Sequence, residues 1–318
     1  MQPVMLSYRR FNKPGLLKFA VIASLLTAAL PFCTPAQQHG QQTFGSAEEA
    51  SQALVTAAQN NDPQAMLKIL GPEGKQIISS GDDAEDAENR ANFVQKFQQM
   101  HRLVREPDDT TTLYIGAENW PTPIPLMAKG NSWYFDTEAG KREILYRRIG
   151  RNELSAGRVC QELEAAEKEY RSAHQDYPHR IISDQGQHDG LYWKTGEGEP
   201  RSPIGPLLAA AIVSDSEKNP DGTPTPYRGY YFHPVTQQNA SDKTEGFAFI
   251  AFPAEYRSSG VMTFIVGADG VVYQKDLGKK TPTVRKSIRA FAADSSWQRV
   301  EDLPEETADE RTSEKDKN

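Results

Sequence analysis

The sequence predicts an α+β fold: N-terminal helices with a small antiparallel sheet, then a long central helix packed on a C-terminal antiparallel sheet. Three observations predict it. Helical periodicity dominates residues 47–103, short β-branched and aromatic runs occupy 111–135 and 246–274, and a long apolar stripe lies between the two sets of runs. Because only short Pro or Gly-Asn turns separate neighbouring runs, the sheets are expected to be antiparallel.

The first 36 residues have the layout of a secretory signal peptide. Four positive charges and no acid precede Phe19–Leu30, a run of twelve residues without a charge. That run is too short to span about 30 Å of hydrocarbon as a stable anchor. Thr34-Pro35-Ala36 offers small residues to a signal peptidase, so we expect cleavage after Ala36 and a mature chain that begins near Gln37.

Two alternatives to this export signal stay open. Cys33 is a candidate for lipidation, although Phe32 stands where lipoprotein processing needs a small residue. Arg9-Arg10-Phe11-Asn12-Lys13 resembles part of a twin-arginine signal. The hydrophobic run and the incomplete motif favour the general secretory route, and hence a periplasmic or secreted protein of a Gram-negative bacterium.

Composition and charge limit the partners of the mature chain. The full chain of 318 residues has a net charge of -7, and cleavage leaves 32 of its 36 basic residues against 43 acidic ones, a net charge of -11. This balance argues against nucleic acid as the main partner, because phosphate binding needs a basic face. No membrane span is expected after cleavage. Of the 2 cysteines only Cys160 remains, so no intramolecular disulfide can form.

The predicted N-terminal elements begin with three helices. Ser46 to Glu49 form a capping-box pattern that opens a helix over about 47–60, and Asn61-Asp62-Pro63 opens a short helix through Leu70. A third amphipathic helix is indicated by Phe93, Val94, Phe97, Met100 and Leu103. Strands are predicted at Thr111–Ile115, Ile124–Ala128 and Ser132–Phe135, and a further helix over about 137–149.

The clearest periodicity in the chain is an apolar stripe on a predicted helix of about 25 residues. Its members are Ala156, Val159, Leu163, Ala166, Tyr170 and Ala173. We expect this helix to pack lengthwise on a sheet, with Glu167 on a neighbouring polar face; a coiled-coil partner is the alternative. Cys160 lies beside the stripe and is interpreted as a small buried filler rather than a reactive thiol.

The predicted C-terminal elements follow a loop-rich stretch, 177–228, that contains one helix near Leu207 to Val213. Gly246 to Phe252 is apolar on both faces and therefore predicts a central strand. Val261–Val266 and Val271–Gln274 flank a four-residue hairpin loop. Val284, Ile288 and Phe291 indicate a last helix.

These elements divide the chain into a signal peptide (1–36), a helical and small-sheet domain (37–150), a long-helix and sheet domain (151–300) and a tail (301–318). The tail holds eight acids, three bases and one Leu, and is expected to be disordered.

Five sequence blocks follow one another along the chain: Asn119–Leu126, Trp133–Gly140, Arg147–Leu154, Arg228–Phe232 and Gly260–Phe264. In this order they resemble the blocks of a bacterial exported family called domain of unknown function 2950. The resemblance covers about 43–300 and implies a Gram-negative envelope or secreted protein, but it brings no activity or site residues. Arg257 stands where the family pattern leads us to expect Gly.

Motifs for metals and cofactors are weak, and no metal or cofactor is predicted. The chain contains no P-loop, dinucleotide-binding glycine pattern, HExxH, GxSxG or paired CxxC. His174, His179 and His188, with Asp184 and Asp189 among them, fit no known ligand spacing. The acidic run Asp215, Glu217, Asn219 and Asp221 places Gly222 at position 8, whereas an EF-hand loop needs Gly at position 6.

The densest charged constellation is the candidate site. It comprises Asp136, Glu138, Glu143, Arg147, Arg148, Arg151 and Glu153, near Trp120 and Trp133. The candidate binding residues are Trp120, Trp133, Asp136, Glu143, Arg147, Arg148 and Glu153. A structural ion-pair network is the favoured interpretation, with Glu143 and Arg147 paired at i,i+4 spacing. The alternatives are binding of a sugar or peptide, or acid/base hydrolysis.

The leading functional hypothesis is a non-enzymatic periplasmic protein that binds or scaffolds an unknown envelope protein or ligand. It depends on the signal peptide and on the missing catalytic motifs. One alternative is an envelope glycan or peptide hydrolase that uses carboxylates near Asp136 and Glu143. A second is a pilin-like assembly component, which requires the stripe from Ala156 to Ala173 to be exposed.

Overall fold

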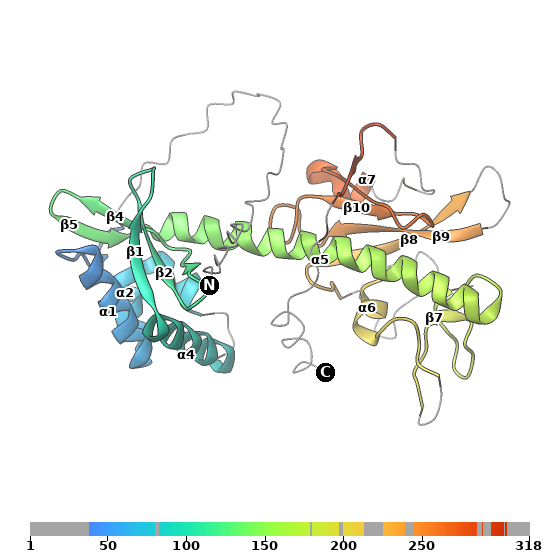
Figure 1. The fold of residues 1–318 in the computed structure, drawn as a ribbon, viewed down its shortest axis with the longest axis horizontal. Coiled ribbons are helices and arrows are strands. Elements are labelled where there is room, and N and C mark those ends of the chain that lie inside the picture. The colour runs from blue at the N-terminus through green and yellow to red at the C-terminus, as the bar shows by residue number, and fades with distance from the viewer. Residues whose placement is uncertain are drawn as a thin grey trace, which may run out of the picture. The chain divides into compact units, whose positions relative to one another are not determined.

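The computed structural model describes residues 38–79, 83–178, 180–196, 200–212, 225–238, 245–284, 288, 294–301 and 303. It confirms the α+β class: N-terminal helices and one antiparallel sheet precede a long helix, and a second antiparallel sheet follows it (Figure 1). The predicted signal peptide, the acidic run 215–222 and residues 304–318 lie outside the described residues. The division at residue 150 stays a prediction; residues 37–318 form one compact unit.

The N-terminal helices begin where their caps predict. The Ser46 Oγ accepts a hydrogen bond from the Glu49 N–H at 3.0 Å, and Asp62 Oδ1 accepts one from Ala65 N–H at 2.9 Å. Each acceptor satisfies a backbone donor that the first turn leaves unpaired. The helices are α1 (Ala47–Gln59), α2 (Pro63–Leu70), the 3-10 turn η1 (Pro72–Gly74), α3 (Lys75–Ile78) and α4 (Asp83–Gln99).

The third predicted helix ends earlier than its apolar spacing indicates, so the placement of Leu103 on it was wrong. Helix α4 stops at Gln99, and Leu103 lies in a strand, β1 (His101–Arg105), that pairs antiparallel with β2 (Thr111–Ile115) along its whole length. The Gly116 N–H donates to Lys96 O and Met100 O at 3.0 and 2.9 Å, which caps the end of α4. Long-range pairing with β2 therefore overrides the helical spacing.

The first sheet packs one face on the helices. Its order is β1-β2-β4-β5, with β3 (Trp120–Pro121) on β2; β4 is Leu126–Lys129 and β5 is Ser132–Phe135. Along β2 the residues at 111, 113 and 115 are buried and those between them are partly exposed. Leu113 and Ile115 pack with Val55 of α1 and Phe97 of α4. This part of the chain, residues 38–136, is called the N-terminal module below.

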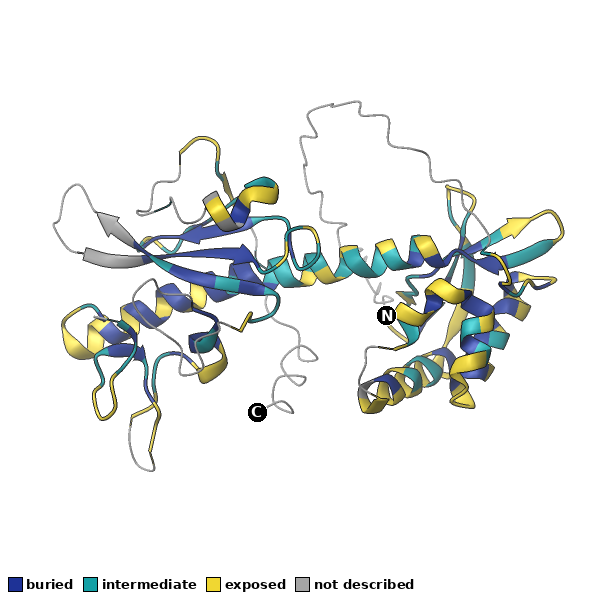
Figure 2. Cartoon of the chain, turned by 180° about the vertical axis from the view of Figure 1, so that it is seen from behind, coloured by how far each residue is buried: buried dark blue, intermediate teal, exposed yellow. Residues whose placement is uncertain are grey.

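Helix α5 (Thr137–His174) is one continuous helix of 38 residues, whereas the sequence predicted two. Gly150 was the only interruption between the two predicted segments. A glycine inside a helix costs about 1 kcal/mol, which is too little to end a helix that has contacts on both sides. After a buried start at Thr137 and Gly140, residues 141–154 of α5 are all half-exposed or exposed, and the second half is buried along one face (Figure 2).

The C-terminal sheet has the order β12-β11-β10-β9-β8 and is antiparallel throughout. Its strands are β8 (Tyr230–Gln238), β9 (Glu245–Pro253), β10 (Thr263–Val266), β11 (Val272–Lys275) and β12 (Gln298–Arg299). The predictions of a central strand at β9 and of a β10–β11 hairpin are confirmed. One face packs on α5, and the other carries a second apolar cluster that includes Ile250 and Ile265.

The apolar stripe of α5 packs on this sheet, as predicted. Leu163 and Cys160 have no exposed surface, and burial raises the pKa of the Cys160 thiol, which keeps it protonated. Two details were wrong. Glu167 is buried rather than on a polar face, and Ala173 is exposed. Residues 155–303, with the second half of α5, are called the C-terminal module below.

The remaining elements come, in chain order, between α5 and β8 or after β11. A parallel pair of strands, β6 (Arg180–Ile182) and β7 (Gly190–Tyr192), occupies the stretch predicted as loops, followed by α6 (Pro206–Ala211). The 3-10 turn η2 (Gly278–Lys280) and α7 (Thr281–Val284) follow the sheet. Leu303, predicted to be part of a disordered tail, packs against the C-terminal core. No described helix is both long and apolar enough to cross a membrane.

Candidate functional site

The predicted site residues do not converge on one pocket, because they are distributed along the first half of α5 and its neighbours. The first group joins α5 to the small sheet. Arg147 Nε donates to Glu143 Oε1 at 2.7 Å, its Nη1 donates to Pro121 O at 2.8 Å, and its guanidinium carbon lies 5.7 Å from the Trp120 ring centroid. The predicted i,i+4 pair of Glu143 and Arg147 is therefore present and holds β3 against the helix.

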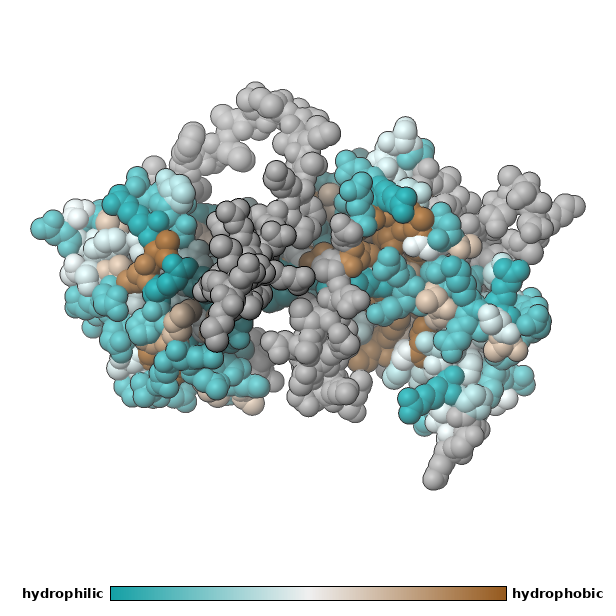
Figure 3. All heavy atoms as spheres, in the orientation of Figure 1, coloured by the Kyte–Doolittle hydropathy of each residue, from teal (hydrophilic) through white to brown (hydrophobic). Residues whose placement is uncertain are grey.

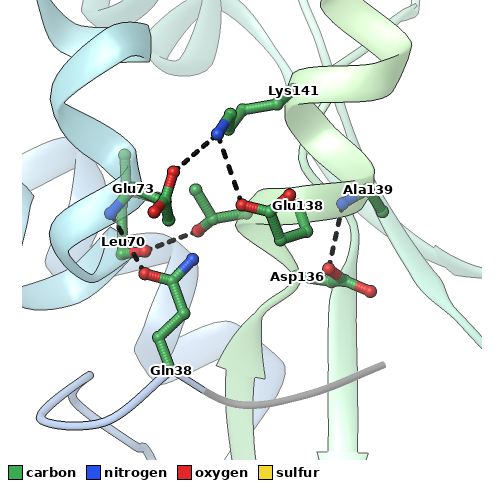
Figure 4. Close-up of polar contacts among 8 residues, drawn as sticks. Gln38, Leu70, Glu73, Asp136, Glu138, Ala139 and Lys141 are labelled. Atoms are coloured by element: carbon green, nitrogen blue, oxygen red, sulfur yellow. Dashed lines mark hydrogen bonds and ion pairs between the residues drawn. The ribbon is translucent and has the colours of Figure 1, made fainter. Parts of the chain in front are cut away.

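The second group fixes the start of α5 (Figure 4). Asp136 is buried, and its Oδ1 accepts the Ala139 N–H at 3.0 Å as the helix N-cap. One turn on, Lys141 Nζ contacts Glu73 Oε2 at 2.6 Å and Glu138 Oε1 at 3.4 Å. The hydrogen bond to Glu73 is the main cause of a raised Lys141 pKa. The Asp136 carboxylate thus caps a helix.

The third group joins α5 to the loop between β9 and β10. Glu153 Oε1 accepts the backbone N–H groups of Val261 and Met262 at 2.8 and 3.0 Å, and Asn152 Nδ2 donates to Ser259 O at 2.8 Å. Arg148 Nη2 donates to Ser258 Oγ at 3.4 Å. These contacts satisfy backbone groups of a loop, which is a structural task.

Trp133 lies apart from the other candidates. Its backbone forms a two-way hydrogen-bonded bridge with Phe44, at 2.8 and 2.9 Å, and its side chain packs on the N-terminal core. Of the histidine and aspartate cluster of the C-terminal module, His179 lies outside the described residues, and the other members have internal contacts. Tyr170 stacks on His174, Trp193 stacks on His188, and Arg180 pairs with both Asp184 and Asp189. The described residues contain no group of three or more metal-ligating side chains.

The N-terminal module contains a cavity of about 670 Å³ between its helices and the sheet. Its apolar lining is drawn from α1 to α4, β2, β5 and the segment before β4: Leu54, Met66, Leu70, Ile77, Ile78, Phe93, Leu113, Ile115, Ile124 and Phe135. Ligand pockets in proteins measure roughly 300–1,000 Å³ and are mostly apolar with a few placed polar groups. Its size and lining therefore match those of a small-molecule site. Apolar side chains come to the surface of this module among hydrophilic ones (Figure 3).

Polar and aromatic residues complete the cavity lining. They are Asp86, Asn89, Arg90, Asn92, Lys96, Glu118, Trp120, Thr122 and Pro123. Lys96 Nζ and Glu118 Oε2 are 3.5 Å apart and both side chains are largely exposed, so this pair belongs to the rim. Trp120 is 51% exposed although it is a large aromatic residue. It is the one predicted site residue that lines the cavity; Asp136 and Glu143 are not among the lining residues.

Arg90 differs from the other charged lining residues. It lies on α4, and its Nε is buried with no hydrogen-bond acceptor in reach in the described part of the chain. Buried donors in proteins are nearly always paired, so an unpaired guanidinium nitrogen at a cavity calls for an explanation.

The sequence also matches a family of proteins of unknown function, DUF2950, over residues 41–300, more than four fifths of the chain. This protein belongs to the DUF2950 family. No curated protein and no solved structure matches the chain. The resemblance that the sequence blocks indicated is thus confirmed, and the family name assigns no reaction.

The structure shows how the blocks that resemble the DUF2950 family contact one another. Asp136 caps α5, and a Cβ on Gly140 would lie 2.7 Å from the Ile124 side chain, so only glycine allows this close approach. Arg147 bonds the block around Trp120, and Glu153 bonds the block around Val261. Arg257 has φ of 64°, the left-handed conformation that glycine favours, which explains why glycine was expected there.

Sequence analysis missed the cavity and the α4 residues that line it. Phe93 and Phe97 were recognised as an apolar face, but nothing in their spacing distinguishes a face that closes a core from one that borders a cavity. Arg90 is an ordinary charged residue on an amphipathic helix in the sequence. Only its buried, unpaired Nε distinguishes it.

Proposed function

We propose that this protein is an exported bacterial binding protein whose N-terminal module holds a small, largely apolar ligand in its cavity. The observation that carries the proposal is the cavity itself: about 670 Å³, with an apolar interior and a rim of charged and aromatic side chains. The cavity opens to solvent, and its volume and mostly apolar lining lie in the range of small-molecule sites.

The contacts of the predicted site residues favour binding over hydrolysis. Asp136 Oδ1 accepts a helix N–H, and Glu143 pairs with Arg147, so the two proposed carboxylates serve local structure. The pilin-like alternative needed an exposed stripe on α5, but Leu163 and its stripe neighbours up to Tyr170 are buried. Neither alternative gains support from a specific contact.

A fluorescence assay tests the binding function. The neutral apolar dye N-phenyl-1-naphthylamine brightens in apolar surroundings, and we expect saturable binding at one site per chain. Replacing Trp120 by Ala should weaken dye binding about tenfold, because aromatic residues at the edge of a site carry much of the contact energy. Trp120 is half exposed, so its removal should leave the fold intact.

The matched control is Tyr146→Ala. Tyr146 is 63% exposed and does not line the cavity, so this variant should bind the dye like the unchanged protein. A second variant, Thr122→Phe, adds volume at a half-buried lining residue and should also lower dye affinity. No saturable binding, or equal loss in the Trp120 and Tyr146 variants, would refute the proposal.

Export is a separate part of the proposal and has its own test. The observation that motivates it is the order of basic, apolar and small residues along positions 1–36. N-terminal sequencing of the mature protein should begin near Gln37. A mature protein that retains Phe19–Leu30 would contradict export by cleavage, and a lipid on Cys33 would select the lipoprotein alternative.

A further inference from the structure

The charged lining of the cavity indicates what kind of ligand it takes. Arg90 contributes a guanidinium group, which has N–H donors and no acceptor, and it lies on the same helix as Phe93 of the apolar lining. Its Nε is buried and has no acceptor among the described residues. The Arg90 side chain as a whole is half-buried at the edge of the cavity, and an anion beside an incompletely paired guanidinium group is stabilised by its charge.

The other cations and anions of the lining do not offer the same opportunity. Lys96 already lies 3.5 Å from Glu118, and both are exposed to solvent, so this pair has little to gain from a ligand. Asp86 is buried and already takes part in an interaction of its own. Arg90 is thus the group best placed to select an anion at the cavity.

We propose that the ligand is a single-chain amphiphile with an anionic head group; this inference rests on the proposed binding function. The head group, a carboxylate or a phosphate, lies against the guanidinium group of Arg90, and the hydrocarbon chain lies among Phe93, Leu113 and Ile115. Planar guanidinium groups suit both head groups, because their N–H donors match carboxylate and phosphate oxygens.

Displacement of the neutral dye from the full chain distinguishes this proposal from the binding function. The competitors are dodecanoate, dodecyl phosphate and 1-dodecanol, each below its micelle concentration, so that only the head group differs. We expect at least one of the two anions to displace the dye at about tenfold lower concentration than the alcohol, the effect of one charge-assisted hydrogen bond. The anion that displaces at lower concentration identifies the head group.

Substitutions at Arg90 test the assigned residue. Arg90→Met should abolish the preference for the anion and change the affinity for 1-dodecanol less than about twofold, because only the charged contact is lost. Arg105→Met is the control: Arg105 is exposed, pairs with Asp109 and does not line the cavity, so the preference should persist. If Arg90→Met does not fold, Arg90→Gln gives the same test with a polar side chain.

The outcomes separate the two proposals. If the dye does not bind, the binding function is refuted. If the dye binds but the alcohol and both anions displace it equally well, the proposal of an anionic ligand is refuted and the binding function is retained. An anion preference that survives both Arg90 substitutions also refutes the assignment to Arg90.

Discussion

The two modules share helix α5, but their interiors differ in how closely they are packed. In the C-terminal module the sheet is covered on both faces, and its central strand β9 contributes Phe249, Ile250 and Ala251 with no exposed surface. In the N-terminal module the sheet and helices border an open cavity of about 670 Å³. The candidate function therefore lies where packing is incomplete, whereas the clearest sequence periodicity marks the region where packing is complete.

Truncating the α5 stripe should have the largest effect on stability. Leu163 is fully buried in the C-terminal core, so Leu163→Ala should lower the free energy of unfolding by about 2–5 kcal/mol through lost burial and a new cavity. Urea denaturation followed by circular dichroism measures it. Glu169→Ala, at an exposed position of the same helix, should change stability by less than about 0.5 kcal/mol. Equal small effects would mean that the C-terminal module is not closely packed.

The corresponding truncation in the N-terminal module should cost less. Leu113 is as buried as Leu163, but it already borders the cavity and therefore has fewer contacts to lose. Leu113→Ala should lower the free energy of unfolding by about 1–3 kcal/mol, at the lower end of core truncations. The same urea experiment measures it. A loss as large as that of Leu163→Ala would break the comparison, because both interiors would then be equally packed.

A substitution at Arg257, in the loop between β9 and β10 that contacts the middle of α5, should increase the stability of the protein. Arg257 has φ of 64°, and a left-handed conformation costs an L residue about 1–2 kcal/mol. After the entropy of a more flexible unfolded chain is subtracted, Arg257→Gly should stabilise the protein by about 0.5–1 kcal/mol. The neighbouring Ser258 has an ordinary φ, so Ser258→Gly should be destabilising in the same thermal melt. A destabilising Arg257→Gly would mean that the arginine side chain contributes more than its backbone strain costs.

The smallest effect is expected for the ion pair of Glu143 and Arg147, which both lie in the first half of α5. The Arg147 side chain is 25% exposed and that of Glu143 is 44% exposed, so water screens their attraction. A double-mutant cycle with Glu143→Gln and Arg147→Gln should give a coupling of about 0.5 kcal/mol. A coupling well above about 1 kcal/mol would indicate a more buried network than the structure has. Stabilisation by Glu143→Gln with no coupling would instead favour the hydrolase alternative.

Features that depend on neighbours a few residues apart could be predicted from the amino-acid sequence. The caps at Ser46 and Asp62, the β10–β11 hairpin and the stripe around Leu163 all follow from local hydrogen bonds or from helical and strand periodicity, and all were predicted. The helix cap at Asp136 and the pairing of Glu143 with Arg147 are equally local. The pairing was predicted, whereas Asp136 was named only as a member of the charged constellation and not as the cap of α5.

Which of these residues contact one another, and where the interior stays open, depends on tertiary contacts. Strand β1 exists because it pairs with β2, although its residues continue a helical pattern, and α5 runs through Gly150 because both of its halves have partners. The cavity beside Arg90 depends on how helices and strands far apart in sequence fit together. Periodicity specifies which face of an element is apolar, but the volume left between such faces is set by long-range packing, which no local pattern encodes.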